Sequence, residues 1–325
     1  MASADQIKSL IRSYGDGDEE RFFTSAIQIA ASEARQGHTA FAQELKSLIE
    51  KAKKNRSLSF LDRNKTIPLS LPKRELHELI EVFQPKVKLK DMVLDTEVKE
   101  HLDKVVREQQ KWEILRQHNL MPVRKLLLQG PPGCGKTMTA QALAGELGIP
   151  VFIVRLDGLI SKFMGESISK LRLIFDAMPD HRGVYLFDEF DSIGSHRDQG
   201  QDVGEIKRVL NSFLINIEKD QSNSIIIAAT NLPDSLDKAL FRRFDDIITY
   251  PLPAEKEIAE TMKKNLKGFK FKGKVDWKAL AKKAVGLNYS EIVRACEETI
   301  KSMIMSGGES LLKTDLESAI TKRRS

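Results

Sequence analysis

The chain has 325 residues, of which 41% are apolar and 30% are charged, so it is long enough for about two or three domains around a real hydrophobic core. Its apolar runs are far shorter than a membrane span and its first ten residues lack a signal-peptide apolar region, so we expect a cytoplasmic protein that does not contact a membrane. The net charge of +6 is spread over lysine runs with interspersed acids, which favours solvated faces over a nucleic-acid surface.

The first part of the chain is predicted to be helical. Between residues 3 and 54, apolar side chains recur at helical spacing, with breaks at residues 15–18 and at Gly37. Each helix is too short to bury its own apolar stripe, so we expect residues 1–54 to form a small three-helix unit. The sequence leaves open whether this unit binds a partner or substrate, or serves only packing or oligomerisation. Residues 55–87 have the polarity and prolines of a linker, with one short helix at residues 74–83.

From residue 88 the pattern changes to short apolar runs that alternate with helices, which is typical of a parallel sheet with crossover helices. These runs are rich in leucine or β-branched residues, as strands buried on both faces should be. The expected strands are residues 125–129, 151–156, 184–188, 225–230 and 246–250. We therefore predict an α/β domain at residues 88–252. Residues 253–325 are predicted to form a separate helical lobe, with helices at 255–266, 277–284, 289–305 and 314–322.

A glycine-rich loop follows the first of these strands and precedes a predicted helix. Its spacing is G-x-x-x-x-G-K-T, which lets successive backbone N–H groups surround a polyphosphate next to the positive end of the helix dipole. Lys136 is expected to neutralise phosphate oxygens, and the hydroxyl of Thr137 to bind Mg²⁺. The predicted nucleotide-binding residues are Gly130, Pro131, Pro132, Gly133, Cys134, Gly135, Lys136, Thr137 and Met138.

Two adjacent carboxylates stand at the end of the third predicted strand. Asp188 and Glu189 follow a buried apolar run, where neighbouring negative charges would repel each other unless a cation and a water occupied the site. Asp188 is therefore expected to be a partner of Mg²⁺. Glu189 is expected to act as the general base that activates the water attacking the γ-phosphorus of ATP.

Polar residues near the ends of the last two strands complete the predicted chemistry. Asn231 follows the fourth strand, where its amide is expected to position the lytic water or to contact the γ-phosphate. Arg242 and Arg243 precede the fifth strand, and a guanidinium suits the charge that develops in phosphoryl transfer. Because these arginines lie far along the chain from the glycine loop, we expect them to act on the nucleotide of a neighbouring subunit.

Three segments together resemble the AAA subgroup of the AAA+ ATPases: the loop at residues 130–137, Leu-Phe-Asp-Glu at residues 186–189, and the stretch at residues 228–245. The resemblance covers residue 88 to the end of the sequence. It implies a P-loop NTPase fold, an α/β sandwich around a five-stranded parallel sheet, with a helical lid and nucleotide between them. It also implies that Asn231 is a polar sensor and that Arg242 and Arg243 reach across the interface of a ring, usually a hexamer.

The segment between the second strand and the next helix is similar to the pore loop of protein-threading AAA proteins. Lys162, Phe163, Met164 and Gly165 give the aromatic, hydrophobic, glycine order of that loop, which grips side chains of many kinds without reading sequence. Residues 195–203 occupy the place of a second pore loop.

Two positions depart from the AAA pattern or add to it. Tyr289 stands where the family commonly has a glycine near the adenine, which puts the lid contact to nucleotide in question. Cys134 lies inside the phosphate loop, which suggests that thiol reagents would block nucleotide binding.

The chain carries no His-Glu-x-x-His run, because His77-Glu78 is followed by Leu79-Ile80-Glu81, so any proteolysis needs a separate protease chain. A single ATPase domain with a small helical N-terminal unit resembles the bacterial stand-alone AAA ATPases. Some of those accompany subtilisin-like serine proteases in plasmid-exclusion or phage-defence systems.

The sequence therefore predicts a Mg²⁺-dependent ATPase that assembles as a homo-oligomeric ring. We expect it to use ATP hydrolysis to unfold, thread or remodel a protein substrate. The alternative is an ATP-controlled switch or loader that acts on nucleic acid or on one partner protein without threading.

Overall fold

The structure is a computed structural model. It describes residues 25–27, 29–30, 32–33, 38, 41–43, 45–49, 79–156, 166–194, 203–236 and 238–324. The chain divides into two compact units, Met1–Leu69 and Ser70–Ser325. In the first unit the described residues at 25–27, 29–30, 32–33, 41–43 and 45–49 are helical. The predicted pore-loop residues Lys162, Phe163, Met164 and Gly165 lie outside the described residues, as do residues 195–202 of the second loop.

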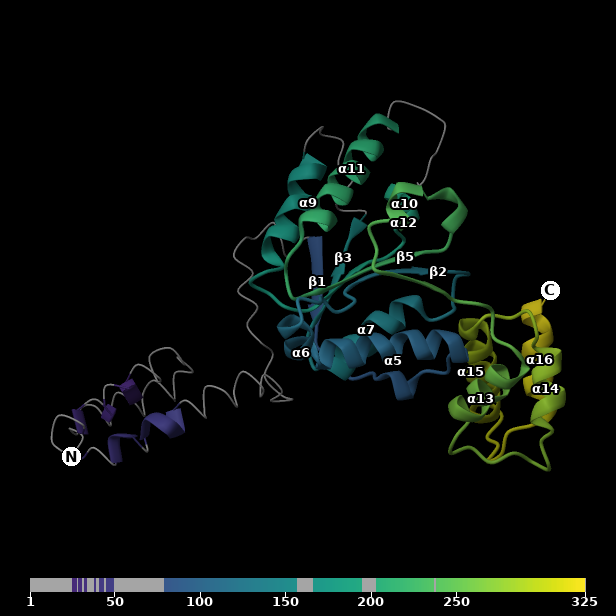
Figure 1. Cartoon of the computed structure of the whole chain (residues 1–325). Helices are drawn as coiled ribbons and strands as arrows, with labels where there is room; N and C mark the ends of the chain where they lie inside the picture. Colours follow the sequence, from purple (N-terminus) through teal and green to yellow (C-terminus); the bar gives the residue numbers. More distant parts are fainter. Residues whose placement is uncertain are drawn as a thin grey trace. The chain divides into compact units, whose positions relative to one another are not determined.

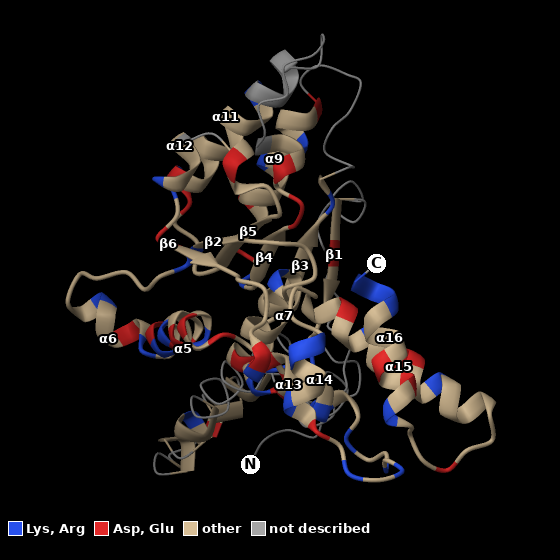
Figure 2. Cartoon of the chain, turned by 90° about the vertical axis from the view of Figure 1, so that its right-hand side faces the viewer, with Lys and Arg blue, Asp and Glu red and all other residues tan. Residues whose placement is uncertain are grey.

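The second unit is built on one mixed sheet of six strands (Figure 1). The strands lie side by side in the order β1-β3-β4-β5-β2-β6, which Figure 2 shows along the sheet. Their bounds are β1 Ile80–Phe83, β2 Lys125–Gln129, β3 Val151–Val154, β4 Val184–Phe187, β5 Ile225–Thr230 and β6 Asp246–Thr249. The pairs β3–β4, β4–β5, β5–β2 and β2–β6 are parallel, so the five strands expected from the apolar runs are all present.

The sixth strand, β1, corrects the end of the helix predicted at residues 74–83, of which residues 74–78 lie outside the described residues. Residues 80–83 are extended and pair antiparallel with β3, with Ile80 opposite Val154 and Phe83 opposite Val151. The β-branched residues Ile80 and Val82 alternate with Glu81, which is exposed, so the segment suits a strand at the edge of a sheet. Pairing with β3 satisfies the backbone N–H and C=O groups of this segment.

Helices cover both faces of the sheet (Figures 1 and 2). On one face lie α5, α6 and α7, and on the other lie α9, α10, α11 and α12. Their bounds are α5 Thr96–Gln110, α6 Trp112–Gln117, α7 Lys136–Leu147, α9 Glu166–Ala177, α10 Asp191–Gly194, α11 Val203–Lys219 and α12 Lys238–Phe241, with short 3-10 helices at Leu89–Asp91 and Pro233–Ser235. The core is dense on both faces, and every residue of β4 and β5 is buried.

The helix beneath the sheet centre packs unusually closely. Ala140, Ala142 and Ala144 of α7 are fully buried. A Cβ added at Gly145 would lie 2.1 Å from the carbonyl oxygen of Val87, so glycine is required for this approach. This contact holds the last turn of α7 against the segment between β1 and the 3-10 helix at Leu89–Asp91.

Four helices form the C-terminal lobe, close to the predicted bounds: α13 Glu255–Asn265, α14 Trp277–Lys283, α15 Tyr289–Met305 and α16 Lys313–Arg324. Its separate core includes Ile258, Met262, Leu280, Ile292 and Leu316. Caps define the helix starts: Asp276 accepts from two backbone N–H groups of α14, and Asn288 forms a reciprocal capping box with Glu291. Within the described part of the chain, no helix has the length and apolar character needed to cross a membrane.

Candidate nucleotide site

The glycine loop joins the carboxyl end of β2 to the start of α7. Its three glycines have positive φ, +140° at Gly130, +73° at Gly133 and +97° at Gly135. A Cβ at Gly130 would lie 2.3 Å from the carbonyl oxygen of Tyr250, and one at Gly133 would lie 2.6 Å from Oδ1 of Asn288. Glycine alone fits this conformation and this space. The end of β6 and the lid therefore hold the loop in a defined shape.

Tyr250 also contacts the end of the glycine loop at Gly135, through Thr139. Its hydroxyl and the hydroxyl of Thr139, both buried, are 2.7 Å apart, and Thr139 donates at 3.0 Å to the carbonyl oxygen of Gly135. The backbone N–H of Tyr250 donates to the carbonyl oxygen of Gln129 at 2.7 Å. Burial raises the pKa of Tyr250, so its hydroxyl keeps its proton at an alkaline pH where an exposed tyrosine would lose it. One tyrosine thus contacts the chain on both sides of the glycine loop.

The ammonium of Lys136 lies within the turn of the loop. Its Nζ donates to the carbonyl oxygens of Gly130 at 2.6 Å and Pro131 at 2.8 Å, and the side chain is 6% exposed. Burial lowers the pKa of Lys136, and the negative charge of Asp188 opposes that shift. The cation is therefore held beside the place where the loop N–H groups converge, and phosphate oxygens bound there would lie near it.

Thr137 and the two strand-end carboxylates meet at the carboxyl edge of the sheet. Oγ1 of Thr137 donates to Oδ2 of Asp188 at 2.6 Å, and Oδ1 of Asp188 accepts from the backbone N–H of Glu189 at 2.9 Å. Glu189 is exposed and has φ +49°, a left-handed conformation that costs energy in a residue other than glycine.

The oxygen atoms of Thr137 and Asp188 at the carboxyl edge of the sheet fit a magnesium ion. Thr137 supplies a hydroxyl oxygen and Asp188 a carboxylate oxygen, the hard ligands that Mg²⁺ prefers. The described residues include no group of three or more His, Cys, Asp or Glu side chains arranged to hold a metal. Mg²⁺ usually takes one or two protein oxygens and completes its shell with phosphates and water, so the pair suits a nucleotide-bound ion rather than a resident one.

Asp191 is a part of the site to which the sequence analysis gave no role. Its Oδ1 accepts from Oγ1 of Thr230 at 3.0 Å and from the backbone N–H of Asn231 at 3.2 Å. Oγ1 of Thr230 in turn accepts from the backbone N–H of Leu232 at 3.0 Å. The carboxylate therefore joins the turn after β4 to the turn after β5. It fixes the backbone of Asn231 at the same edge of the sheet as Asp188 and Glu189.

The predicted arginines have different surroundings. Nε of Arg243 lies 3.4 Å from Oε2 of Glu218, near the end of α11. Arg242 is exposed, and its guanidinium has no hydrogen bond or ion pair with another residue that the structure describes. Both follow α12 and precede β6, whereas the glycine loop begins at the carboxyl end of β2, which runs parallel to β6. They thus lie toward the amino end of the sheet, away from their own chain's glycine loop.

The lid contacts the glycine loop directly, at the position where Tyr289 departs from the family pattern. The backbone N–H of Ser290 donates to the carbonyl oxygen of Gly133 at 3.2 Å. Tyr289 is partly buried against the core of the α/β domain. The start of α15 therefore rests on the loop through a backbone hydrogen bond that does not depend on the residue type at position 289.

The remaining residues of the loop differ in exposure. Met138 is 39% exposed in the first turn of α7, whereas Cys134 is 1% exposed. The Cys134 thiol lies 3.9 Å from the carbonyl oxygen of Pro132, and burial raises its pKa. A buried thiol with a raised pKa reacts slowly, which opposes the expectation that thiol reagents readily block the site.

Comparison with known proteins agrees with this geometry. Residues 126–252 match the "ATPase family associated with various cellular activities (AAA)". The chain is 34% identical to the "Uncharacterized AAA family ATPase y4kL" of Sinorhizobium fredii, over 98% of this chain and 95% of that protein. It is 31% identical to the "ATP-dependent zinc metalloprotease FtsH 3" of Sphaerobacter thermophilus, over 74% of this chain but 50% of that protein. It is 33% identical to the FtsH of Mesoplasma florum, over 61% of this chain and 31% of that protein. The phosphate loop, the strand-end acids and the near full-length match to y4kL together show that this chain is an ATPase of the AAA family.

Proposed function

We propose that this ATPase assembles as a ring, hydrolyses MgATP at each subunit and uses the energy to unfold or thread a protein substrate. Lys136, Thr137 and Asp188 would hold MgATP, and Glu189 would activate the attacking water. The hydrogen bond between Thr137 and Asp188 carries the nucleotide part of this proposal, because it brings the two predicted Mg²⁺ ligands together.

The arrangement of the arginines supports the ring. Arg242 is exposed and Arg243 is paired within its own chain to Glu218, at the end of the sheet opposite to their own glycine loop. A guanidinium that stabilises the transition state must approach the γ-phosphate. Arg242 and Arg243 would therefore reach the γ-phosphate of a nucleotide bound to a neighbouring subunit.

Threading rests on the sequence of the predicted pore loop and on the relatives. Phe163, Met164 and Gly165 have the order expected of a loop that grips polypeptide. The FtsH proteins are ATP-dependent proteases by name, but the chain spans only 50% and 31% of the two compared here. We therefore propose that if proteolysis follows threading, a separate protease supplies it.

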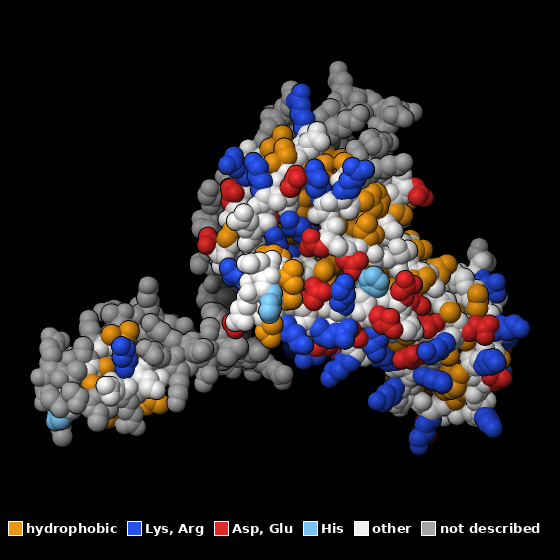
Figure 3. All heavy atoms as spheres, in the orientation of Figure 1, with side chains coloured by type: hydrophobic (Ala, Val, Ile, Leu, Met, Phe, Trp, Pro, Cys, Tyr) orange, Lys and Arg blue, Asp and Glu red, His pale blue; other side chains and the backbone are white. Residues whose placement is uncertain are grey.

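One observation favours the alternative of a nucleic-acid-dependent switch. The lid segment at residues 263–283 contains nine lysines and a single acid, Asp276. Figure 3 shows many basic side chains on the exposed surface of this lobe, with acidic side chains among them. A surface of this sign would attract phosphates in a salt-dependent way. The same experiment therefore has to test nucleic acid beside polypeptide.

The experiment is a steady-state ATPase assay of the purified protein with an unfolded polypeptide, single-stranded DNA or double-stranded DNA, at one fixed moderate salt concentration. We expect polypeptide to raise the rate and DNA to leave it unchanged. The increment should disappear in Phe163→Ala and remain in Phe269→Ala, a matched variant of an aromatic side chain 39% exposed on the lid. Stimulation by DNA alone would contradict threading and support the switch.

A further inference from the structure

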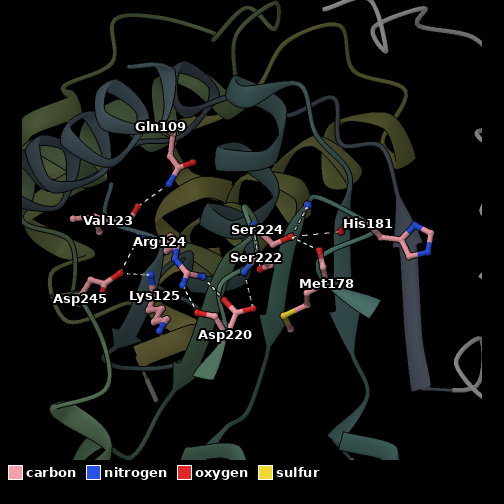
Figure 4. A network of polar contacts seen from close by, with 11 residues as sticks. Gln109, Val123, Arg124, Lys125, Met178, His181, Asp220, Ser222, Ser224 and Asp245 are labelled. Carbon is pink, nitrogen blue, oxygen red and sulfur yellow. Dashed lines mark hydrogen bonds and ion pairs between the residues drawn. The ribbon is translucent and has the colours of Figure 1, made fainter. Parts of the chain in front are cut away.

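Asp245 comes two residues after the arginine pair and joins it to the start of β2. Its Oδ2 accepts from the backbone N–H groups of Arg124 and Lys125, each at 2.9 Å. Its own N–H donates to the carbonyl oxygen of Lys125 at 2.8 Å. Figure 4 shows the Asp245 carboxylate facing these two residues. Three hydrogen bonds thus fix the backbone of Asp245, two of them strengthened by the negative charge of the acceptor.

The partner of Asp245 is itself anchored. The guanidinium of Arg124 donates to the carboxylate and to the carbonyl oxygen of Asp220, just after α11, and the two side chains are 7% and 3% exposed. Figure 4 shows this pair beside Asp245. A buried and mutually satisfied pair holds its backbone firmly, since loss of either member would leave a buried charge without a partner. Asp245 is therefore hydrogen-bonded to a backbone segment that a buried ion pair anchors in turn.

The same stretch of chain holds the arginines from the other side. Glu218, two residues before Asp220, is the ion-pair partner of Arg243, and Phe244 between Arg243 and Asp245 is 8% exposed. The segment at residues 242–245 is thus held by a buried ring, a carboxylate bridge to β2 and an ion pair to α11. Of these, the exposed Arg243–Glu218 pair is the weakest, because solvent screens it.

We propose that Asp245 is a positioning residue of the ATPase: through the start of β2 it sets the direction in which Arg242 and Arg243 point at the neighbouring subunit's nucleotide. The inference rests on the proposed ring and on the action of the arginines in trans. Misplacement of a catalytic group by about 1 Å can cost about a hundredfold in rate. Releasing two backbone N–H groups at the base of the arginine segment is enough to allow such a displacement.

The test begins with Asp245→Ala and its conservative control, Asp245→Asn. The amide oxygen of asparagine can accept the same two N–H groups, whereas alanine leaves both without an acceptor. We expect the ATPase rate to fall about 10- to 100-fold in Asp245→Ala, with the ATP dissociation constant changed by less than about twofold, and to be largely restored in Asp245→Asn.

A complementation assay then separates positioning of the arginines from damage to the variant's own nucleotide site. Reference subunits are Lys136→Ala, which lacks nucleotide binding but keeps its arginines, and the double variant Arg242→Ala/Arg243→Ala, which keeps its nucleotide site. Differently tagged subunits are co-expressed and the mixed assemblies are purified through both tags. Under the proposal, Asp245→Ala regains ATPase activity with Lys136→Ala and not with the double arginine variant.

The other complementation results of Asp245→Ala overturn the inference. Recovery of Asp245→Ala with the double arginine variant would place its defect in its own phosphate loop. Recovery with neither partner would make Asp245 a residue of general structural importance. A failure of the two reference variants to complement each other would instead contradict the proposed ring. A triple variant decides the role of Asp245 in that case: adding Asp245→Ala to the double arginine variant should cause no further loss, and an additional 10-fold loss would refute positioning.

Discussion

Oγ1 of Thr137 and Oδ2 of Asp188 lie 2.6 Å apart and share a hydrogen bond, although 51 positions separate the two residues in the chain. Thr137 is the second residue of α7, and Asp188 directly follows the last residue of β4. Their meeting joins the phosphate-binding and metal-binding parts of the predicted site. The acid that follows, Glu189, stands beside them in a left-handed backbone conformation.

Replacing Glu189 with glutamine should stop hydrolysis without preventing ATP binding. The amide keeps the size of the side chain but cannot take a proton from the attacking water, a loss expected to slow turnover about 10²- to 10⁴-fold. The measurement is the steady-state ATPase rate together with ATP affinity by calorimetry or fluorescent nucleotide.

Asp188→Asn is the matched control for that experiment. It removes the carboxylate charge that would face Mg²⁺, so it should weaken the magnesium-dependent part of ATP binding. Loss of ATP binding in Glu189→Gln, or full ATPase activity in it, would show that the roles given to the two acids are wrong.

Asp191→Ala should lower the ATPase rate about tenfold while ATP still binds. Its carboxylate holds both the hydroxyl of Thr230 and the backbone of Asn231, and hydrogen bonds to a charged group are worth about 1.5–3 kcal/mol. Asp191→Asn keeps an acceptor oxygen and should retain most of the activity. Equal loss of kcat in both variants would show that the negative charge, rather than the placement of Asn231, matters.

As the pH rises, ATP affinity should begin to fall at a lower pH than it would if Lys136 had the pKa of a solvent-exposed lysine. Burial lowers the pKa of Lys136, so this ammonium loses its proton, and with it its attraction for phosphate, earlier than a solvated lysine near pH 10.4. Bound phosphate favours the charged form, so ATP binding above neutral pH should take up protons. Calorimetry in buffers of different ionisation enthalpy between about pH 8 and 10 measures both effects.

Lys136→Arg provides the control for the pH experiment, because a guanidinium remains charged throughout this range. Its affinity for ATP should be weaker but should not depend on pH through this group. If wild-type and Lys136→Arg proteins lost affinity in parallel, the titrating group would lie elsewhere.

Gly133→Ala should separate the lid from the phosphate loop and weaken ATP binding. The added Cβ would lie 2.6 Å from Oδ1 of Asn288, at a backbone φ of +73°. Gly268→Ala is a matched control, because it also has positive φ, +99°, but no atom lies within 4 Å of its added Cβ. ATP affinity and thermal stability of both variants check this, and equal effects would show that backbone strain alone is responsible.

Much of the fold could be predicted because its determinants are local. The five parallel strands are short apolar runs, and the lid helices carry their own caps, such as Asp276 and Asn288. Strand β1 was missed because residues 80–83 become a strand only through pairing with β3, about 70 residues later. Pairing partners far along the chain leave little trace in local composition.

The candidate site likewise has parts that depend on contiguous sequence and parts that depend on contacts between residues far apart in the chain. The phosphate loop and the strand-end acids are contiguous motifs, so the sequence alone was enough to propose their residues. The contacts of Asp191 with Thr230 and of Asp245 with Arg124 span 39 and 121 positions. An aspartate near a strand end is common, and only the fold reveals which backbone groups it holds. The sequence likewise could not reveal that Lys136 donates to the carbonyl oxygens of its own loop.

The central claim, that this ATPase grips a polypeptide, is tested most directly by crosslinking from position 163. A photoreactive phenylalanine analogue replaces Phe163 in the Glu189→Gln background, and a labelled unfolded polypeptide is irradiated with the protein in the presence or absence of ATP. The same analogue at Phe269 on the lid is the control. The account predicts an ATP-dependent crosslink from position 163 and none from position 269. Absence of a crosslink from position 163 to a polypeptide that stimulates the ATPase would contradict it.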